Sequence, residues 1–313
     1  MHNRVAGRLA AVGIAALAMG IAATPAHAEK IANSYICVFK NDRVAKDDVP
    51  GRANAAAKAQ GGAVKHIYRN TIRGFSANMS EQAVTAMRRA NPSIAYCEQD
   101  QVVTLGPIRA EARPGGGGTQ PAQTTPWGIT RVGGFADGTG KRAWIIDSGI
   151  DGSHPDLNVD TARSKDFTGS RSGWKDESGH GTHVAGTVAA KNNSVGVVGV
   201  AAGASVVAVR VLDRRGSGSY SGVIAGVEYV ASNAGAGDVA NMSLGGPVSQ
   251  ALDDAVIAAG AKLAMVLAAG NESDNAANHS PARAGGVSKT DRVYAVSAST
   301  QTNALASFSN YGL

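Results

Sequence analysis

The sequence predicts an α/β fold, with a mainly parallel sheet that carries helices on both faces, preceded by a small α+β unit. From Trp127 onward, short apolar runs alternate with helical patterns. Such alternation is typical of parallel strands joined by crossover helices. The chain also has 40 glycines and few aromatic residues, which favours close packing between elements and many tight turns.

Five apolar runs predict the buried strands of this sheet: Ala143–Ile146, Val206–Val211, Val239–Met242, Leu263–Ala269 and Val293–Ser297. Three helices are predicted between them, near Thr182–Ala190, Tyr220–Asn233 and Ser249–Ala259. Ligands of open parallel sheets bind beyond the carboxyl ends of the strands. The residues that directly follow these strands are therefore the candidates for a functional site.

Residues 33–103 follow a different order: strand, helix, strand, strand, helix, strand. The strands are predicted at Ser34–Lys40, His66–Tyr68, Gly74–Met79 and Ile94–Gln99, and the helices at Gly51–Gln60 and Glu81–Ala90, the second capped by Ser80. This is the ferredoxin-like arrangement, in which the first and last strands lie side by side. Cys37 and Cys97 would then be neighbours, and both a disulfide and two buried thiols remain open.

The N-terminus has the layout of a secretory signal. Basic residues precede an apolar run from Leu9 to Ala23, and Ala26-His27-Ala28 forms a small-x-small cleavage site. We therefore expect an exported protein, and no later segment is apolar enough to span a membrane. The predicted domains are the signal peptide at 1–28, the small unit at 29–105, a Gly- and Pro-rich linker and processing region at 106–125, and the α/β domain at 126–313.

The net charge of +6 does not predict nucleic-acid binding. Residues 1–109 contain 14 of the 30 basic residues but only 7 of the 24 acidic ones. The excess of positive charge is thus N-terminal, and the α/β domain lacks the basic face that a nucleic acid would require.

Three polar residues stand at the predicted ligand edge or close to it. Asp147 follows the first strand, Asn271 follows the fourth, and His180 opens the first long helix. Separately, each is explained as a cap, a turn residue or a buried histidine. Together they suit acyl transfer, in which Asp orients an imidazole that acts as general base and an Asn amide donates to the oxyanion. We expect the helix dipole to lower the pKa of His180 and favour its neutral form.

Several motifs resemble those of the subtilisin-like serine proteases (subtilases), closest to the proteinase K branch: D-S-G-I at 147–150, H-P-D-L at 154–157, G-H-G-T-H-V-A-G at 179–186, S-L-G-G at 243–246, A-A-G-N at 268–271 and S-F-S-N-Y-G at 307–312. The resemblance covers roughly residues 126–312. Residues 33–103 resemble the inhibitory, fold-assisting propeptide of that family. The resemblance implies a secreted endopeptidase with a subtilisin-like sheet, made as a zymogen.

The resemblance also assigns site residues. Asp147 and His180 would be triad members, and Asn271 the oxyanion-hole donor. An extended peptide would pair with two backbone edges, and small residues would line the primary specificity pocket, implying broad cleavage after apolar residues. The edges are Ser217, Gly218 and Ser219, and Ser243, Leu244 and Gly245; the pocket residues are Ala268, Ala269 and Gly270. No cofactor is required for this chemistry and no metal residue is assigned, although structural calcium is common in the family, with ligands unknown here.

The nucleophilic serine of the family is not found. It belongs to a G-T-S-M-A motif some tens of residues after S-N-Y-G, whereas this sequence reaches Leu313, one residue beyond that motif. Ser148 is too close to Asp147 to be its triad partner, and Ser280 belongs to a Ser-Pro-Ala loop. We expect the chain as written to be truncated before the nucleophile and unable to form an acyl-enzyme.

Two other functions have partial support in the sequence. His180 and His183 do not have the spacing of a zinc helix, so metal-dependent hydrolysis is disfavoured and His183 is interpreted as a packed structural residue. The chain could also be a non-catalytic exported inhibitor or folding module with a decayed peptidase domain. Expected partners are peptide or protein substrates and the protein's own propeptide in cis, with no nucleic acid, no membrane span and a monomeric state. Maturation is expected within Arg109–Thr125.

Overall fold

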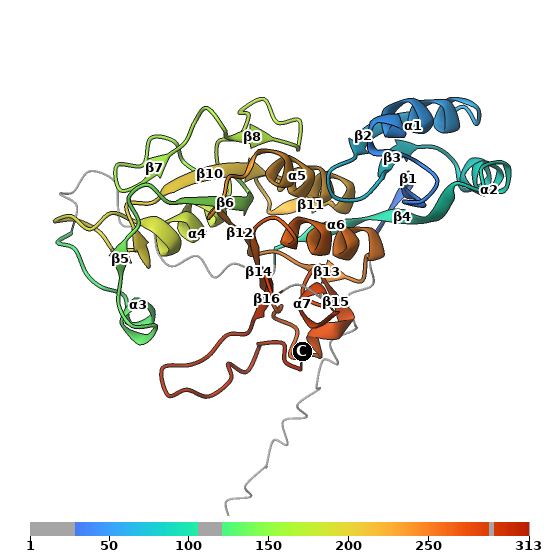
Figure 1. Ribbon diagram of the computed structural model, residues 1–313. Coiled ribbons are helices and arrows are strands. Elements are labelled where there is room, and N and C mark those ends of the chain that lie inside the picture. Colours follow the sequence, from blue (N-terminus) through green and yellow to red (C-terminus); the bar gives the residue numbers. More distant parts are fainter. Residues whose placement is uncertain (1–28, 106–120, 288–290, 313) are drawn as a thin grey trace, which may run out of the picture.

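The computed structural model describes residues 29–105, 121–287 and 291–312 (Figure 1). The predicted signal peptide at 1–28 and most of the predicted linker lie outside the described residues. In Figure 1 the N-terminal unit lies at one end of the molecule, and its last strand reaches into the α/β domain. The two predicted units are therefore joined by a shared strand.

The N-terminal unit has the predicted ferredoxin-like order. Its elements are β1 (Lys30–Phe39), η1 (Lys46–Asp48), α1 (Val49–Lys58), β2 (Ala63–Tyr68), β3 (Gly74–Asn78), α2 (Glu81–Ala90) and β4 (Ile94–Thr104). The four strands lie in the order β4-β1-β3-β2, and the Ser80 side chain caps α2 by accepting from Ala83 N. The apolar faces of α1 and α2 pack on this sheet and form a core of their own.

Cys37 and Cys97 form a disulfide. The two residues face each other in the antiparallel ladder of β1 and β4, and the Cys37 side chain lies in the core of the unit with 1% of its surface exposed. The disulfide therefore fastens the first strand of the unit to the strand that continues into the α/β domain.

The α/β domain is built on the predicted sheet, with strand order β16-β14-β12-β6-β10-β7. Its strands are β6 (Arg142–Asp147), β7 (Asn158–Val159), β8 (Lys165–Asp166), β10 (Ser205–Arg210), β12 (Val239–Met242), β14 (Ala264–Ala268) and β16 (Val293–Val296). All neighbouring strands of the sheet run parallel. The predicted fold class is thus confirmed.

Helices cover both faces of this sheet. On β6, Trp144 and Ile146 join the core beneath α5 (Tyr220–Asn233) and α6 (Gln250–Gly260). The alternate residues Ala143 and Ile145 join a second core beneath α4 (His180–Ala189). Since successive strand residues point to opposite faces, burial on both faces explains why these strands read as continuous apolar runs.

Short elements were not predicted, because they hold too few residues for a periodic pattern to develop. They are α3 (Trp127–Arg131), β5 (Ala136–Asp137), β9 (Ala201–Ala202), β11 (Ser217–Ser219), β13 (Gly246–Pro247), η2 (Ala276–Asn278), β15 (His279–Ser280) and α7 (Ala284–Val287). Of these, β11 matters most for function, because it lies at the predicted substrate edge. None of the helices in the described part of the chain is both long and apolar enough to cross a membrane.

We expect the disulfide to stabilise the N-terminal unit. It joins residues 60 positions apart, and the chain-entropy relation gives a contribution of about 4 kcal/mol for a loop of that length. The Cys37→Ser, Cys97→Ser double variant should therefore show faster amide hydrogen exchange in β1 and β4. The strands β6 and β10 serve as the internal control, and unchanged exchange in β1 and β4 would contradict the expectation.

Candidate active site

The buried carboxylate of Asp147 lies at the carboxyl end of β6. Its backbone carbonyl accepts hydrogen bonds from Val211 N (2.8 Å) and Leu212 N (3.3 Å), which tie the end of β6 to the chain that leaves β10. Its side chain is fully buried. Both carboxylate oxygens lie within hydrogen-bond distance of His180 Nδ1, at 2.8 and 2.9 Å. The predicted Asp–His pair is therefore formed in the structure.

Glycines let the helix that carries His180 approach Asp147. A Cβ at Gly181 would lie 2.1 Å from the carbonyl oxygen of Gly149, which is too close for any side chain. Gly149 itself has φ +111°, a conformation that L side chains rarely adopt. Gly149 and Gly181 therefore allow the start of α4 to pack directly against the turn that follows β6.

The expected lowering of the His180 pKa was wrong in direction. Burial does lower the pKa of His180, but the hydrogen bond and charge of Asp147, together with the charge of Asp176, raise it above its usual value. A full negative charge in direct contact outweighs the partial charge of a helix terminus. Asp147 therefore favours a protonated imidazole, the form that a general base reaches after taking a proton.

The predicted substrate edge at Ser217–Ser219 is paired with a strand of the same chain. The end of β4 runs antiparallel to β11, with Thr104, Val103 and Val102 opposite Ser217, Gly218 and Ser219. Leu105 N also donates to Gly216 O at 2.8 Å. The N-terminal unit thus occupies this edge by strand addition (Figure 1).

The side chain of Val103 is fully buried where β4 meets the α/β domain. It belongs to the same apolar cluster as Tyr220 and Leu244, and its Cγ2 would lie 4.0 Å from a Cβ built at Gly246. This position of the edge therefore accommodates an apolar side chain. Leu244 comes from the second predicted edge, so this apolar cluster includes β4 and a residue of that edge.

The remaining predicted residues lie in loops that follow neighbouring strands. Ser243, Leu244 and Gly245 follow β12, and Ala268, Ala269, Gly270 and Asn271 end or follow β14. Because β12 lies between β6 and β14, these loops share the sheet edge of Asp147. Ala269 packs with Ala276 and Ala282, and the Asn271 side chain is exposed.

Three carboxylates join the N-terminal unit to α5 and α6, and sequence reasoning did not find them. Asp100 accepts from Ser221 N (3.0 Å) and Ser221 Oγ (2.6 Å) in the first turn of α5. Glu98 accepts from Ser249 Oγ (2.5 Å) and Gln250 N (3.1 Å) where α6 begins. Negative charge at helix N-termini is stabilising because unpaired backbone N–H groups point outward there.

The third carboxylate belongs to the α/β domain. Glu228 of α5 accepts hydrogen bonds from the backbone N–H groups of Arg69, Asn70 and Thr71, at 2.8–3.0 Å. It stands within an otherwise apolar helical pattern and is 8% exposed. An acidic residue within an apolar helical pattern was the one sequence signal that could have marked Glu228 as a contact to the N-terminal unit.

Ser148 and Ser280, the two serines considered as nucleophiles in the sequence analysis, make structural hydrogen bonds. Ser148 Oγ donates to Asp176, and Ser280 Oγ bonds with the backbone of Ser249. Within the described residues, no serine hydroxyl makes a hydrogen bond with His180 Nε2.

A metal-dependent site gains no support from the structure. The described residues include no cluster of three or more His, Cys, Asp or Glu side chains that could hold a metal ion. His183, expected to be packed, is instead exposed on α4, because the buried face of that helix is formed by Gly181, Ala185 and Ala189. His183 is two residues from both Gly181 and Ala185, which places it on the opposite side of the helix.

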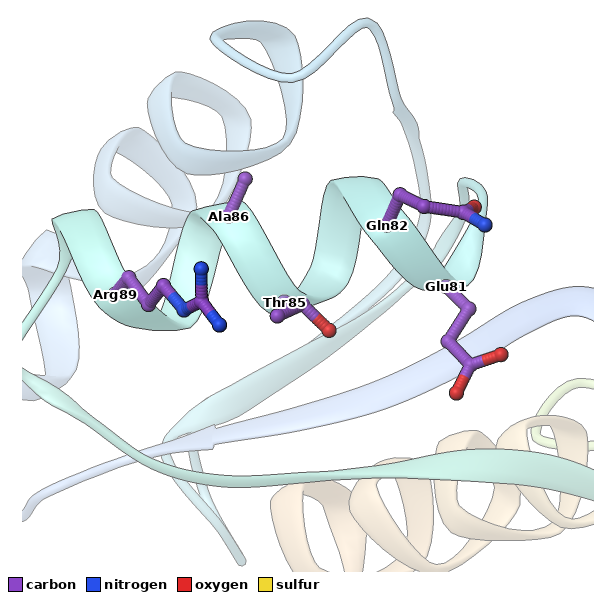
Figure 2. A pocket seen from close by; sticks show the side chains of 5 residues that line it. All are labelled: Glu81, Gln82, Thr85, Ala86 and Arg89. Atoms are coloured by element: carbon purple, nitrogen blue, oxygen red, sulfur yellow. The ribbon is translucent and has the colours of Figure 1, made fainter.

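A pocket of about 380 Å³ lies on α2, far from α4. Its lining residues are Glu81, Gln82, Thr85, Ala86 and Arg89 (Figure 2). All five come from one helix, and α2 and α4 stand at opposite ends of the molecule in Figure 1. This pocket therefore does not belong to the Asp147–His180 site.

We expect Asp147→Asn to lower the pKa of His180, because burial would remain while the opposing charge is removed. In the wild type, the pKa of His180 is raised in the folded state. The protonated imidazole therefore stabilises the fold at pH values below the unfolded-state pKa, and this stabilisation is lost as the pH rises through the folded-state pKa. NMR titration of the histidine Cε1–H signals measures this shift. Asp151→Asn is the control, and a His180 pKa that stays raised in Asp147→Asn would refute the explanation.

Comparison with known proteins agrees with this geometry. Residues 143–313 match the Subtilase family (Peptidase S8), and residues 24–106 match Peptidase inhibitor I9. Subtilisin E of Bacillus subtilis is 37% identical over 287 residues, covering 89% of this chain and 68% of that protein. Proteinase R of Parengyodontium album is 32% identical, covering 92% and 70%.

Two further matches cover a smaller share of the matched protein. Alkaline serine exoprotease A of Vibrio alginolyticus is 37% identical, and the match covers 90% of this chain but 53% of that protein, so the chain spans about half of its length. A crystal structure of a cold adapted subtilisin-like serine proteinase is 40% identical, covering 56% of this chain and 61% of that one with a TM-score of 0.48. The chain belongs to the subtilase family of serine proteases, with an I9-type inhibitor unit ahead of its peptidase domain.

Proposed function

We propose that this chain is the zymogen form of a secreted serine endopeptidase of the proteinase K-like branch, whose substrate edge is blocked in cis by its own I9 unit. The observation that carries the proposal is the Asp147–His180 pair beside a peptide-binding edge that β4 already fills. A strand bound at β11 is oriented as an extended peptide substrate would be. Because this edge is filled within one chain, we propose a monomer.

In the proposed reaction His180 Nε2 takes a proton from a serine hydroxyl while Nδ1–H donates to Asp147. The carboxylate holds the ring in the required tautomer and stabilises the imidazolium that forms. The exposed amide of Asn271 would donate to the oxyanion of the tetrahedral intermediate. No cofactor enters this chemistry.

We propose that none of the serines in residues 1–313 is the nucleophile of this reaction. We propose that a polypeptide with this sequence alone does not form an acyl-enzyme, and that a segment bearing the family's serine completes the site. The alternative is a non-catalytic inhibitor or folding module, in which only the I9 unit acts.

The proposed specificity is broad with an apolar preference. The buried position of Val103 in β4 supports this at one subsite of the edge. The small residues Ala268, Ala269 and Gly270 would leave room for an apolar side chain in the primary pocket. Export is supported by the Cys37–Cys97 disulfide, since disulfides persist mainly outside the reducing cytosol.

We also propose a structural calcium ion near Asp156. This carboxylate is 6% exposed and accepts from Asn193 Nδ2 at 2.7 Å. Gln123 Oε1 accepts from the backbone N–H of Asn193 at 2.5 Å, so a carboxylate oxygen of Asp156 and an amide oxygen of Gln123 both lie beside Asn193. Such oxygens are the ligands that calcium prefers.

The main proposal predicts that residues 1–313 release no product from a chromogenic peptide anilide, whereas the chain extended by a serine-bearing segment does. In the extended protein, Asn271→Ala should lower kcat by about 10²–10³-fold, as expected for an oxyanion donor. His180→Ala should lower it by about 10⁴-fold or more. Asn278→Ala, an exposed amide in the same loop, is the matched control.

Two results would count against this proposal. Activity of His180→Ala equal to that of the parent would exclude the triad. An inactive extended protein, whose isolated I9 unit nevertheless inhibits another subtilase, would favour the inhibitor module.

The calcium proposal predicts that chelation lowers the Tm of the full chain and that added Ca²⁺ restores it. Asp156→Asn should remove this dependence, whereas Asp137→Asn, an exposed aspartate of β5, should retain it. A Tm that is insensitive to chelator in the parent protein would refute the site.

A further inference from the structure

Asp176, in the loop before α4, makes five hydrogen bonds that the proposed mechanism does not use. Its Oδ1 accepts from Ser148 Oγ, Ser178 N and Gly179 N, each at 2.9 Å. Its Oδ2 accepts from Thr182 N at 2.9 Å and Thr182 Oγ1 at 2.6 Å. One carboxylate therefore connects its own loop, the first turn of α4 and the residue next to Asp147.

The helix α4 needs this carboxylate at its start. Its N-cap is Gly179, at φ +91°, which has no side chain to accept from the first backbone N–H groups. Asp176 supplies the missing acceptor through Thr182 N. A negative charge at this end of a helix is also favourable to the dipole. The position of His180, the first residue of α4, thus depends on a side chain outside the helix.

Ser148 carries the connection across to Asp147. It is fully buried, and its Oγ donates to Asp176 while accepting from Gly181 N at 3.0 Å. Its backbone N–H donates to Asp147 Oδ1 at 2.6 Å. Ser148 therefore connects the two groups: its N–H donates to the carboxylate of Asp147, and its hydroxyl links Asp176 to the first turn of α4, which carries His180.

The backbone repeats this connection. Residues Ile150 and Lys175 form a parallel bridge, and Asp176 N donates to Ile150 O at 3.2 Å. The turn after β6 is thus held between the loop of Asp176 and the start of α4, where Gly149 contacts Gly181. A displacement of Asp176 would move both members of the Asp–His pair.

We propose that Asp176 is a positioning residue for the Asp147–His180 pair: it fixes the imidazole against the carboxylate and adds negative charge that favours the imidazolium. This inference rests on the proposed acyl-transfer function. Its electrostatic part agrees with the raised pKa of His180, to which the charge of Asp176 contributes.

Other charged groups of these segments are engaged elsewhere. Asp151 accepts from Ser153, and Glu177 forms an ion pair with Arg210 at 2.6 Å. Among the described carboxylates, Asp147 and Asp176 are the two whose charges raise the pKa of His180. The effect of Asp176 can therefore be separated from that of Asp147 by substitution.

The test compares Asp176→Asn with Asp166→Asn in the full chain. Asp166 is a matched control, because it also accepts four hydrogen bonds within its own turn, from Thr168, Gly169 and Ser170, but contacts neither Ser148 nor α4. NMR titration should show the His180 pKa lowered in Asp176→Asn and unchanged in Asp166→Asn. In the serine-bearing form, kcat should fall about tenfold or more in Asp176→Asn with KM little changed.

Ser148→Ala is the second variant, used if Asp176→Asn does not fold. It keeps the carboxylate of Asp176 but removes the hydroxyl that donates to it. It should lower kcat in the same direction. Equal His180 pKa values in the two aspartate variants, or an unaltered kcat in Ser148→Ala, would overturn the positioning role. If the serine-bearing parent is inactive, the proposed function fails, yet the titration still decides the role of Asp176.

Discussion

The contact between the end of β6 and the start of α4 is the constraint on which this site depends. Gly149 and Gly181 allow a backbone approach that no side chain would permit. That approach brings the buried carboxylate of Asp147 within 2.8 Å of His180 Nδ1. The low exposure of the pair strengthens its electrostatic interaction, so the histidine is held in one orientation before any substrate arrives.

Carboxylates also lie at helix N-termini where the I9 unit meets the peptidase domain. Glu98 and Asp100 reach the first turns of α6 and α5, and Glu228 receives three backbone N–H groups in return. The pairing of β4 with β11 adds a further connection between the two units, and Val103 of β4 supplies an apolar one.

The large elements could be predicted because both faces of the sheet are buried. The five strands and three long helices of the peptidase domain follow apolar runs such as Val239–Met242 and Tyr220–Asn233, which the structure reproduces. The capping role of Ser80 was equally local. Asp147 and His180 were found because they follow or open such elements. The inhibitory strand was predicted only to Gln99, since its last residues pair with β11 outside the unit's own sheet.

Features that depend on contacts across the chain were missed. Asp176 looks like an ordinary turn residue in the sequence, because its partners Ser148 and Thr182 lie on other segments. His183 was wrongly expected to be packed, and the His180 pKa was predicted in the wrong direction because the contact distance to Asp147 was unknown. Finally, the Cys37–Cys97 disulfide affects how a cleaved inhibitor unit is released from the peptidase domain. A single backbone cut between these residues leaves β1 and β4 in one covalent body, so a nicked inhibitor stays attached to its own docking strand until a cut falls beyond Cys97 or a thiol reductant separates the halves.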